Sequence, residues 1–176
     1  MADANVLSET LKKLNYGIYV VTSRKPAAEL VTRNHDWVAA STVSWVTQVS
    51  MEPLLVGVAL QKTSNLHETI DKSRDFALHI LSEADRELVE AFTGPADFTD
   101  EQVNGHHYEK GETGAPILEE GLGVVEFELE RTIDLGGDHV LVIGKPVAAQ
   151  LRDKRAQSIA IEETRFEYGG KEESAA

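Results

Sequence analysis

The segment from Val38 to Leu60, VAASTVSWVTQVSMEPLLVGVAL, constrains the fold most, because it holds two strand-like runs separated by a proline. β-Branched residues recur through Val38–Ser50 and Leu54–Leu60, which is typical of strands. Pro53 has no backbone N–H and is excluded from the centre of a hydrogen-bonded ladder. We therefore predict two strands joined by a hairpin or a corner at Pro53.

Four more segments are rich in β-branched or aromatic residues and are predicted to be strands: Tyr16–Arg24, Asp75–Leu81, Gly123–Leu135 and Asp138–Arg152. The last two flank the sequence GGDH, which is a strong hairpin signal.

Three short helices are expected between these strands. One covers Ser8–Leu14 behind a Ser8 cap, and one begins near Ser64 or Asn65 with an Asn65/Glu68 capping box. The third covers Ser82–Phe92. Thr93–Ala115 is rich in Gly, Asp and His with little periodicity, so it is expected to be a long loop.

Consecutive strands without a regular alternation of strand and helix predict a mostly β fold, an antiparallel barrel decorated with short α-helices. At 176 residues, the chain is expected to be a single domain over 1–176, with the barrel core at about 11–150. A small, charged tail at about 169–176 is expected to be disordered. Gly121 and Gly123 precede a strand rather than a helix, so a Rossmann fingerprint is absent.

Composition excludes several classes of protein. The chain has no cysteine, which rules out disulfides and thiolate-bound metals. Its formal net charge of -13 opposes the phosphates of nucleic acids and the anionic surface of membranes, so neither is expected as a partner. The sequence shows neither a signal peptide nor a membrane-spanning run, which indicates a cytoplasmic protein.

The uncharged run Val38–Ser50 has two interpretations. Residues two apart on a strand share a face, so one face carries small polar groups and the other carries apolar ones. The polar set is Thr42, Ser44, Gln48 and Ser50, and the apolar set is Val43, Trp45 and Val49. The polar face is either solvated, as is common in antiparallel sheets, or it binds a flat polar ligand. The lack of any charge in so acidic a chain favours the ligand.

The sequence LQKTSN at the start of the second helix indicates an anion site. A helix N-terminus carries a partial positive charge, and Lys62, Thr63, Ser64 and Asn65 place a cation and hydroxyls there. A phosphate fits this pattern. The alternative is that these residues only cap the helix and that Lys62 is a surface lysine.

Together these segments resemble the flavin reductase-like, FMN-binding split-barrel family. The resemblance lies in YGIYVVTSR, STVSWVTQVSMEPLLVGVALQKTSNLHETI, DFALHIL and GDHVLVIGKPV, in that order and spacing, and it covers roughly Leu11–Val147. It implies an antiparallel split β-barrel that forms a homodimer, with FMN near the subunit interface.

The resemblance also implies roles for particular residues. The isoalloxazine and ribityl chain are expected against Ser41, Thr42, Val43, Ser44, Trp45 and Val46. The ribityl and phosphate end is expected against Ser50, Lys62, Thr63, Ser64 and Asn65, with His67 either assisting there or lying on the surface. His139 matches a histidine that the family places beside the flavin where nicotinamide docks. The segment TRNHDWVAAST is longer and more polar than the segment that usually precedes this motif in the family. The contacts of His35, Asp36 and Trp37 are therefore left unassigned.

The remaining histidines have simpler interpretations. His106 and His107 are adjacent, with no third ligand at metal-binding spacing, so no metal site is predicted. His79 lies in an apolar strand and is expected to be a satisfied core residue.

The function implied is an FMN-dependent NAD(P)H:flavin oxidoreductase. It takes electrons from NADH or NADPH and passes them to free flavin or another acceptor, with supply of reduced flavin to a monooxygenase as one use. Because the flavin itself carries the hydride chemistry, no acid/base pair is required. Two alternatives remain open: an FMN electron carrier reduced by a protein partner, and a non-catalytic ligand-binding barrel.

Overall fold

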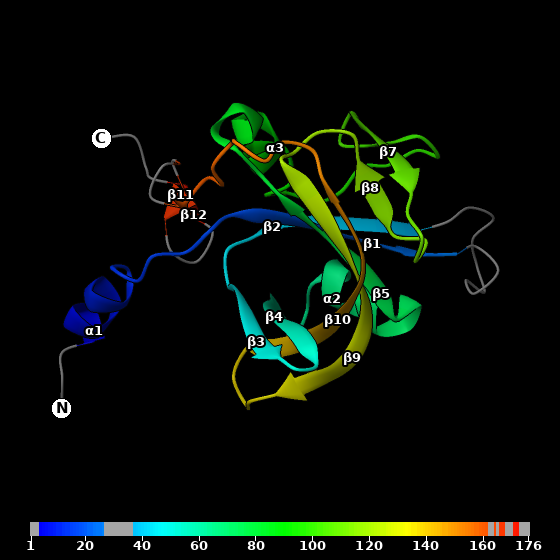
Figure 1. Cartoon of the computed structure of the whole chain (residues 1–176). Helices are drawn as coiled ribbons and strands as arrows, with labels where there is room; N and C mark the ends of the chain where they lie inside the picture. The colour runs from blue at the N-terminus through cyan, green and yellow to red at the C-terminus, as the bar shows by residue number, and fades with distance from the viewer. Residues whose placement is uncertain (1–3, 27–36, 162–163, 165, 168–170, 173–176) are drawn as a thin grey trace.

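The computed structural model of the protein describes residues 4–26, 37–161, 164, 166–167 and 171–172. Its main element is a seven-stranded antiparallel sheet in the order β2-β1-β5-β9-β10-β4-β3 (Figure 1). The strands are β1 (Tyr19–Lys25), β2 (Trp37–Val43), β3 (Val46–Met51), β4 (Leu54–Gln61), β5 (Asp75–Ile80), β9 (Gly123–Asp134) and β10 (His139–Leu151). The expected mostly β, antiparallel fold is confirmed.

The sheet curls back on itself so that its two edge strands come together. β2 and β3 are the opposite edges of the sheet, yet only Ser44 and Trp45 separate them in the chain. Since consecutive Cα atoms are about 3.8 Å apart, Val43 and Val46 lie within about 11 Å of each other. No ladder of hydrogen bonds joins β2 to β3 among the described strands. The result is a split barrel, and we call residues 41–46 the seam.

Short elements decorate this sheet. The helices are α1 (Ala4–Leu11), α2 (Asn65–Ser73), the 3-10 turn η2 (Glu83–Asp85) and α3 (Arg86–Ala91). A separate three-stranded sheet contains β6 (Gln102–Val103), β7 (His106–Lys110) and β8 (Pro116–Leu118), and a small ladder pairs β11 (Phe166–Glu167) with β12 (Lys171–Glu172).

One expectation for an irregular segment needs correction. Thr93–Ala115, expected to be a loop, contains β6 and β7, because these short strands gain their order by pairing with each other and with β8 rather than from a visible period. In the tail expected to be disordered, Lys171–Glu172 pair with Phe166–Glu167. The rest of that tail lies outside the described residues, as do His35 and Asp36.

The buried residues form two main cores, one on each side of the curled sheet. The inner core places Leu66 and Ile70 of α2 among residues of β1, β2, β4, β5, β9 and β10, so α2 fills the interior of the barrel (Figure 1). The outer core covers the other face of β1 and β2 with α3 and the β6–β8 sheet, through Leu88, Val89 and Phe92 among others.

These two cores change the interpretation of the uncharged run Val38–Ser50. Val38 and Ala40 belong to the outer core and Ala39 to the inner one, so β2 begins buried on both faces and has no room for charge. The strand then breaks at Ser44–Trp45, and a register shift follows at Gln48–Ser50. The alternation expected over the whole run is therefore wrong, and burial accounts for part of the missing charge.

The helix starts follow local capping chemistry. The hydroxyl of Ser64 caps α2 by accepting from the His67 N–H at 3.1 Å. The expected Asn65/Glu68 capping box does not form, since Glu68 pairs with Lys72 instead. Ser82 and Asp85 do form a capping box before α3. Ser8 lies inside α1 rather than capping it, because α1 begins at Ala4.

Candidate functional site

The seam is made of half-buried residues from two strands. Ser41, Thr42 and Val43 end β2, Ser44 and Trp45 form the link, and Val46 begins β3. The main chain is fixed from both sides: the Thr42 N–H donates to Phe92 O at 2.9 Å, and Trp45 O accepts from the Ala59 N–H at 2.9 Å. Thr42 Oγ1 donates to Val89 O at 2.8 Å. The Thr42 hydroxyl hydrogen therefore holds the seam against α3 and is not offered to a ligand.

His139 lies next to the seam. It begins β10, opposite Gln61 of β4 in the register. Its ring centroid is 4.9 Å from that of Trp45, with the two planes tilted by 48°. The β9–β10 hairpin and the seam thus bring two aromatic rings from distant parts of the sequence into contact.

The orientation of the His139 ring is set by Asp138. His139 Nδ1 lies 2.9 Å from Asp138 Oδ1. Because an ionised carboxylate only accepts hydrogen bonds, Nδ1 carries a hydrogen, and in the neutral ring Nε2 is an acceptor. The hydrogen bond from His139, together with the positive charge that this ring carries when it is protonated, holds the pKa of the Asp138 carboxyl below its usual value. The hairpin therefore presents a ring of defined tautomer.

The start of α2 lies beside the same hairpin. Ser64 Oγ donates to Gln61 O at 2.9 Å while accepting from the His67 N–H, so its one hydroxyl hydrogen is not available to a phosphate. His67 Nδ1 donates to Lys62 O at 3.1 Å. The side chains of Thr63 and Asn65 are exposed. Of the residues expected at the phosphate, Lys62, Thr63 and Asn65 keep side chains able to face a ligand, while Ser64 serves the helix.

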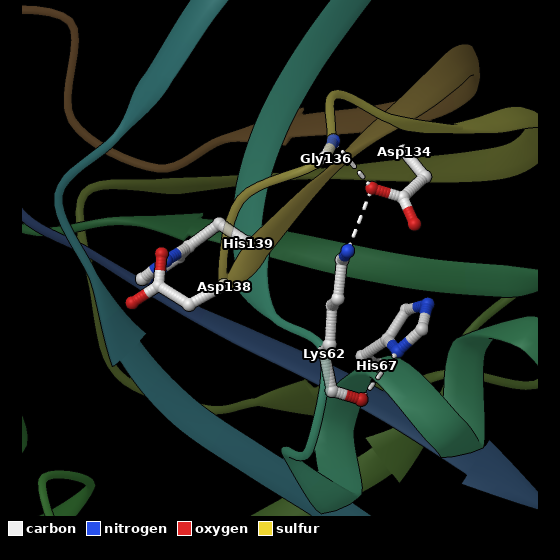
Figure 2. Close-up of polar contacts among 6 residues, drawn as sticks. All are labelled: Lys62, His67, Asp134, Gly136, Asp138 and His139. Carbon is white, nitrogen blue, oxygen red and sulfur yellow. Dashed lines mark hydrogen bonds and ion pairs between the residues drawn. The ribbon is translucent and has the colours of Figure 1, made fainter.

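Lys62 joins this loop to the β9–β10 hairpin. Its ammonium lies 2.7 Å from Asp134 Oδ1, and that oxygen also accepts from the Gly136 N–H at 2.7 Å. Both contacts are drawn in Figure 2. The Lys62 N–H donates to Asp138 O at 3.0 Å. Hydrogen bonds from Lys62 and then Gly136 hold the pKa of the Asp134 carboxyl below its usual value. We call Lys62, His67, Asp134, Asp138 and His139 the hairpin cluster.

Sequence reasoning missed the two acids of the hairpin cluster. Asp134 and Asp138 bracket the LGG turn, and an Asp two residues before a glycine is a common turn former. That signal predicts the turn. It does not predict the pairing with Lys62, which depends on the packing of β4 beside β10.

Ser50 is not brought to this cluster within one chain. It pairs with Leu55 near the start of β4, whereas Lys62 follows the last residue of that strand. Leu55 and Lys62 are seven positions apart, which corresponds to about 23 Å along a strand. The structure therefore places Ser50 and the phosphate-site residues at opposite ends of β4.

The candidate site combines main-chain, aromatic and cationic groups. The seam offers an uncharged main chain, the Trp45–His139 pair offers an aromatic surface, and Lys62 offers a cation at a helix N-terminus.

Within the described residues, no group of three or more His, Cys, Asp or Glu side chains is placed to hold a metal ion. Among those same residues, no helix has the length and apolar character needed to cross a membrane.

Comparison of the chain with known proteins shows the family to which it belongs. A family model described as "Flavin reductase like domain" matches residues 11–168. The "Ferric-chelate reductase (NAD(P)H)" of Archaeoglobus fulgidus is 26% identical over 145 residues, which cover 81% of this chain and 80% of that protein. Some other curated relatives are much longer, and the chain spans 25% and 43% of two of them.

Solved structures agree on the fold. An NADH:FAD oxidoreductase of Streptomyces globisporus, in complex with NAD and FAD fragments, superposes with a TM-score of 0.73 at 22% identity, covering 100% of this chain and 96% of that one. The flavin reductase component of a bacterial two-component tryptophan halogenase superposes with a TM-score of 0.69 at 22% identity, covering 90% and 98%. With a split barrel of this shape and a family model that matches most of its length, the chain belongs to the flavin reductase like domain family.

Proposed function

We propose that this protein is an FMN-dependent NAD(P)H:flavin oxidoreductase that passes electrons to free flavin or another acceptor. The observation that carries the proposal is the meeting of three features at one end of the barrel: the uncharged seam, the Trp45–His139 ring pair and the Lys62 ammonium. The seam and Trp45 would serve the flavin ring, Lys62 would serve its phosphate, and His139 would serve the nicotinamide that docks beside the flavin. The family match supports the same class of reaction.

The residues of the site fit FMN by their donor chemistry. Lys62 and the N-terminus of α2 would hold the phosphate, and exposed Thr63 adds a hydroxyl there. The seam main chain and Trp45 would hold the ring. His139, with Nε2 directed by the Asp138 contact to be an acceptor, would position the nicotinamide. When bound, FMN supplies the hydride chemistry, while this chain orients the reactants and excludes water.

Visible absorbance and anaerobic reduction test this proposal. The purified protein is expected to bind added FMN, and bound FMN is expected to lose its visible absorbance when NADH or NADPH is added without oxygen. Bound flavin that neither nucleotide reduces would contradict the reductase and favour an electron carrier. A protein that binds no flavin would contradict both and favour a non-catalytic barrel.

Lys62→Ala is expected to weaken FMN binding about tenfold while leaving riboflavin binding nearly unchanged. The reason is that only FMN carries the phosphate, and a charge-assisted contact contributes about 1.5 kcal/mol or more. Titration of each flavin into the wild type and the variant measures the effect. Equal losses of affinity for FMN and riboflavin would show that Lys62 does not bind the phosphate.

The supply of reduced flavin to a monooxygenase or halogenase is part of the proposal. Its support is the structural likeness to a reductase component of a two-component halogenase. On this proposal the partner enzyme receives reduced flavin as a diffusing small molecule, so the reductase must release the flavin that it binds.

We expect the protein to be a homodimer. Val49, Leu141 and Ile143 converge within 3.1 to 3.5 Å of the position that a Cβ on Gly57 would take, and Ile133 lies opposite Leu141 on β9. Val49 and Ile133 are 44% and 37% exposed. Partly exposed apolar side chains that gather in this way are typical of an interface. Light scattering of the FMN-bound protein at micromolar concentration should give twice the 19.3 kDa chain mass, and the monomer mass would contradict the expectation.

A further inference from the structure

The cation expected at the flavin phosphate already has an anionic partner. Lys62 Nζ lies 2.7 Å from Asp134 Oδ1, with the Lys62 side chain 32% exposed and the Asp134 side chain 60% exposed. Asp134 comes from the end of β9, whereas Lys62 follows β4, so the pair joins two separate strands (Figure 2). Nothing in the proposed chemistry uses Asp134, and a carboxylate is an unexpected neighbour for a phosphate site.

We propose that Asp134 is a specificity-determining residue that competes with the flavin phosphate for Lys62 and so keeps the bound flavin exchangeable. This inference rests on the proposed function. It predicts that Asp134 lowers the affinity for flavins that carry phosphate, FMN and FAD, and leaves the affinity for riboflavin unchanged. The protein would then treat flavin nucleotide as a substrate that leaves, rather than as a permanent prosthetic group.

Two features of the geometry make competition the expected effect. The Asp134 oxygen that contacts Lys62 also accepts from the Gly136 N–H at 2.7 Å, so the turn of the hairpin holds the carboxylate in place. An incoming phosphate therefore either shares the single positive charge of Lys62 with a fixed anion or displaces Lys62 from it. In both cases the phosphate gains less from Lys62 than it would from a lysine without an anionic partner, which weakens its binding.

The size of the effect follows from the exposure of the pair. Exposed ion pairs contribute little to stability, and their removal typically changes an equilibrium by about two- to fivefold. Because screening lengths shorten from about 10 Å at 0.1 M salt to about 3 Å at 1 M, the effect of Asp134 should fall as salt is raised.

Asp134→Asn is the decisive variant, because its side-chain oxygen can still accept from the Gly136 N–H while the charge is lost. We expect FMN to bind about two- to fivefold more tightly to this variant, with riboflavin unchanged. In a Lys62→Ala background the same substitution should leave the affinity for FMN unchanged, since the cation for which Asp134 and the phosphate compete is gone. Asp134→Glu should keep the wild-type ratio of FMN to riboflavin affinity. Asp134→Ser, which also offers an acceptor to Gly136, replaces Asp134→Asn if that variant does not fold.

Glu83→Gln is the matched control. It makes the same change of net charge and breaks another ion pair, Glu83 with Arg86 at 2.9 Å, in the turn before α3. It should leave both flavin affinities at the wild-type values. A general effect of net charge would instead appear in Glu83→Gln and Asp134→Asn alike, and would overturn the proposal.

Binding titrations of FMN and riboflavin to the full-length protein separate the possible failures. If the wild type binds FMN but Asp134→Asn leaves the FMN to riboflavin ratio unchanged, the role of Asp134 is overturned and the proposed function stands. If Asp134→Asn lowers the affinity for FMN and not for riboflavin, Asp134 orients Lys62 for the phosphate, and the proposed competition is likewise overturned. If the wild type binds neither flavin, the proposed function fails and this inference fails with it.

Discussion

Replacing His139 with alanine is expected to slow the reduction of bound FMN by NAD(P)H about 100-fold, with FMN affinity nearly unchanged. His139 is held at the start of β10 by the hairpin, by the Asp138 carboxylate at 2.9 Å and by the Trp45 ring at a centroid distance of 4.9 Å. A side chain fixed in this way can position a second reactant without a mobile loop. Loss of such positioning costs about 2.7 kcal/mol in the barrier, which is 100-fold in rate.

Stopped-flow reduction without oxygen measures the rate, and thermal melting measures the stability. If His139 only packs on Trp45 and ties down the turn, its removal should lower the free energy of unfolding by about 1 kcal/mol and leave the reduction rate unchanged. His107→Ala is the matched control, because His107 is an exposed histidine whose Nε2 contacts Gln102 at 2.9 Å outside the hairpin cluster. It should have the wild-type rate.

The second large effect expected is a loss of stability in mild acid, caused by His79. This residue of β5 is fully buried, as predicted for a core histidine. Its Nδ1 lies 3.2 Å from Val20 O, and its Nε2 accepts from the Leu118 N–H at 3.0 Å. Both ring nitrogens are thus used by a neutral ring with the hydrogen on Nδ1. His79 joins the main sheet to β8, so its protonation would break a contact between the two sheets.

Burial is the main cause of the pKa shift of His79, and it lowers the pKa from 6.5 to about 4, with a smaller contribution in the same direction from the charge of Arg152. In the unfolded chain the ring titrates near its ordinary value, so between about pH 6.5 and 4 the unfolded state binds more protons. The contribution of His79 to the free energy of unfolding is therefore fully present above this window and is lost as the pH drops through it. The full loss in the free energy of unfolding is about 3 kcal/mol, of which about 2 kcal/mol should appear between about pH 7 and pH 5.

Urea unfolding at about pH 7 and about pH 5 measures this loss. A His79→Gln variant has no titrating ring, so it should be less stable than the wild type at the higher pH but should lose about 2 kcal/mol less on acidification. His107→Gln again serves as a control and should keep the wild-type pH dependence. A His79→Gln protein with the same pH dependence as the wild type would show that another group titrates.

Local patterns in the sequence were enough to predict most elements. Proline at position 53 and the glycines of GGDH predicted hairpins that the structure confirms, between β3 and β4 and between β9 and β10. Ser64 at the start of α2 was predicted within one residue. These features depend on residues close together in the chain, whose backbone preferences act before any tertiary contact forms. The motifs that resemble the family lie in the same segments.

Tertiary structure alone decided which of these elements meet. Nothing local indicates that β2 and β3, two residues apart in sequence, are the opposite edges of one sheet, because strand partners are chosen by long-range packing. The same holds for the burial of Val38–Ala40 on both faces. That burial accounts for part of the missing charge, which the sequence analysis attributed to a ligand. The same holds also for Lys62 and Asp134, whose ion pair exists only because β4 lies beside β10. The sequence determined the strands, the turns and the family. The site arises where the curled sheet brings its ends together. Side-chain contacts across a barrel depend on register and curvature, and not on the residues that are neighbours in the chain.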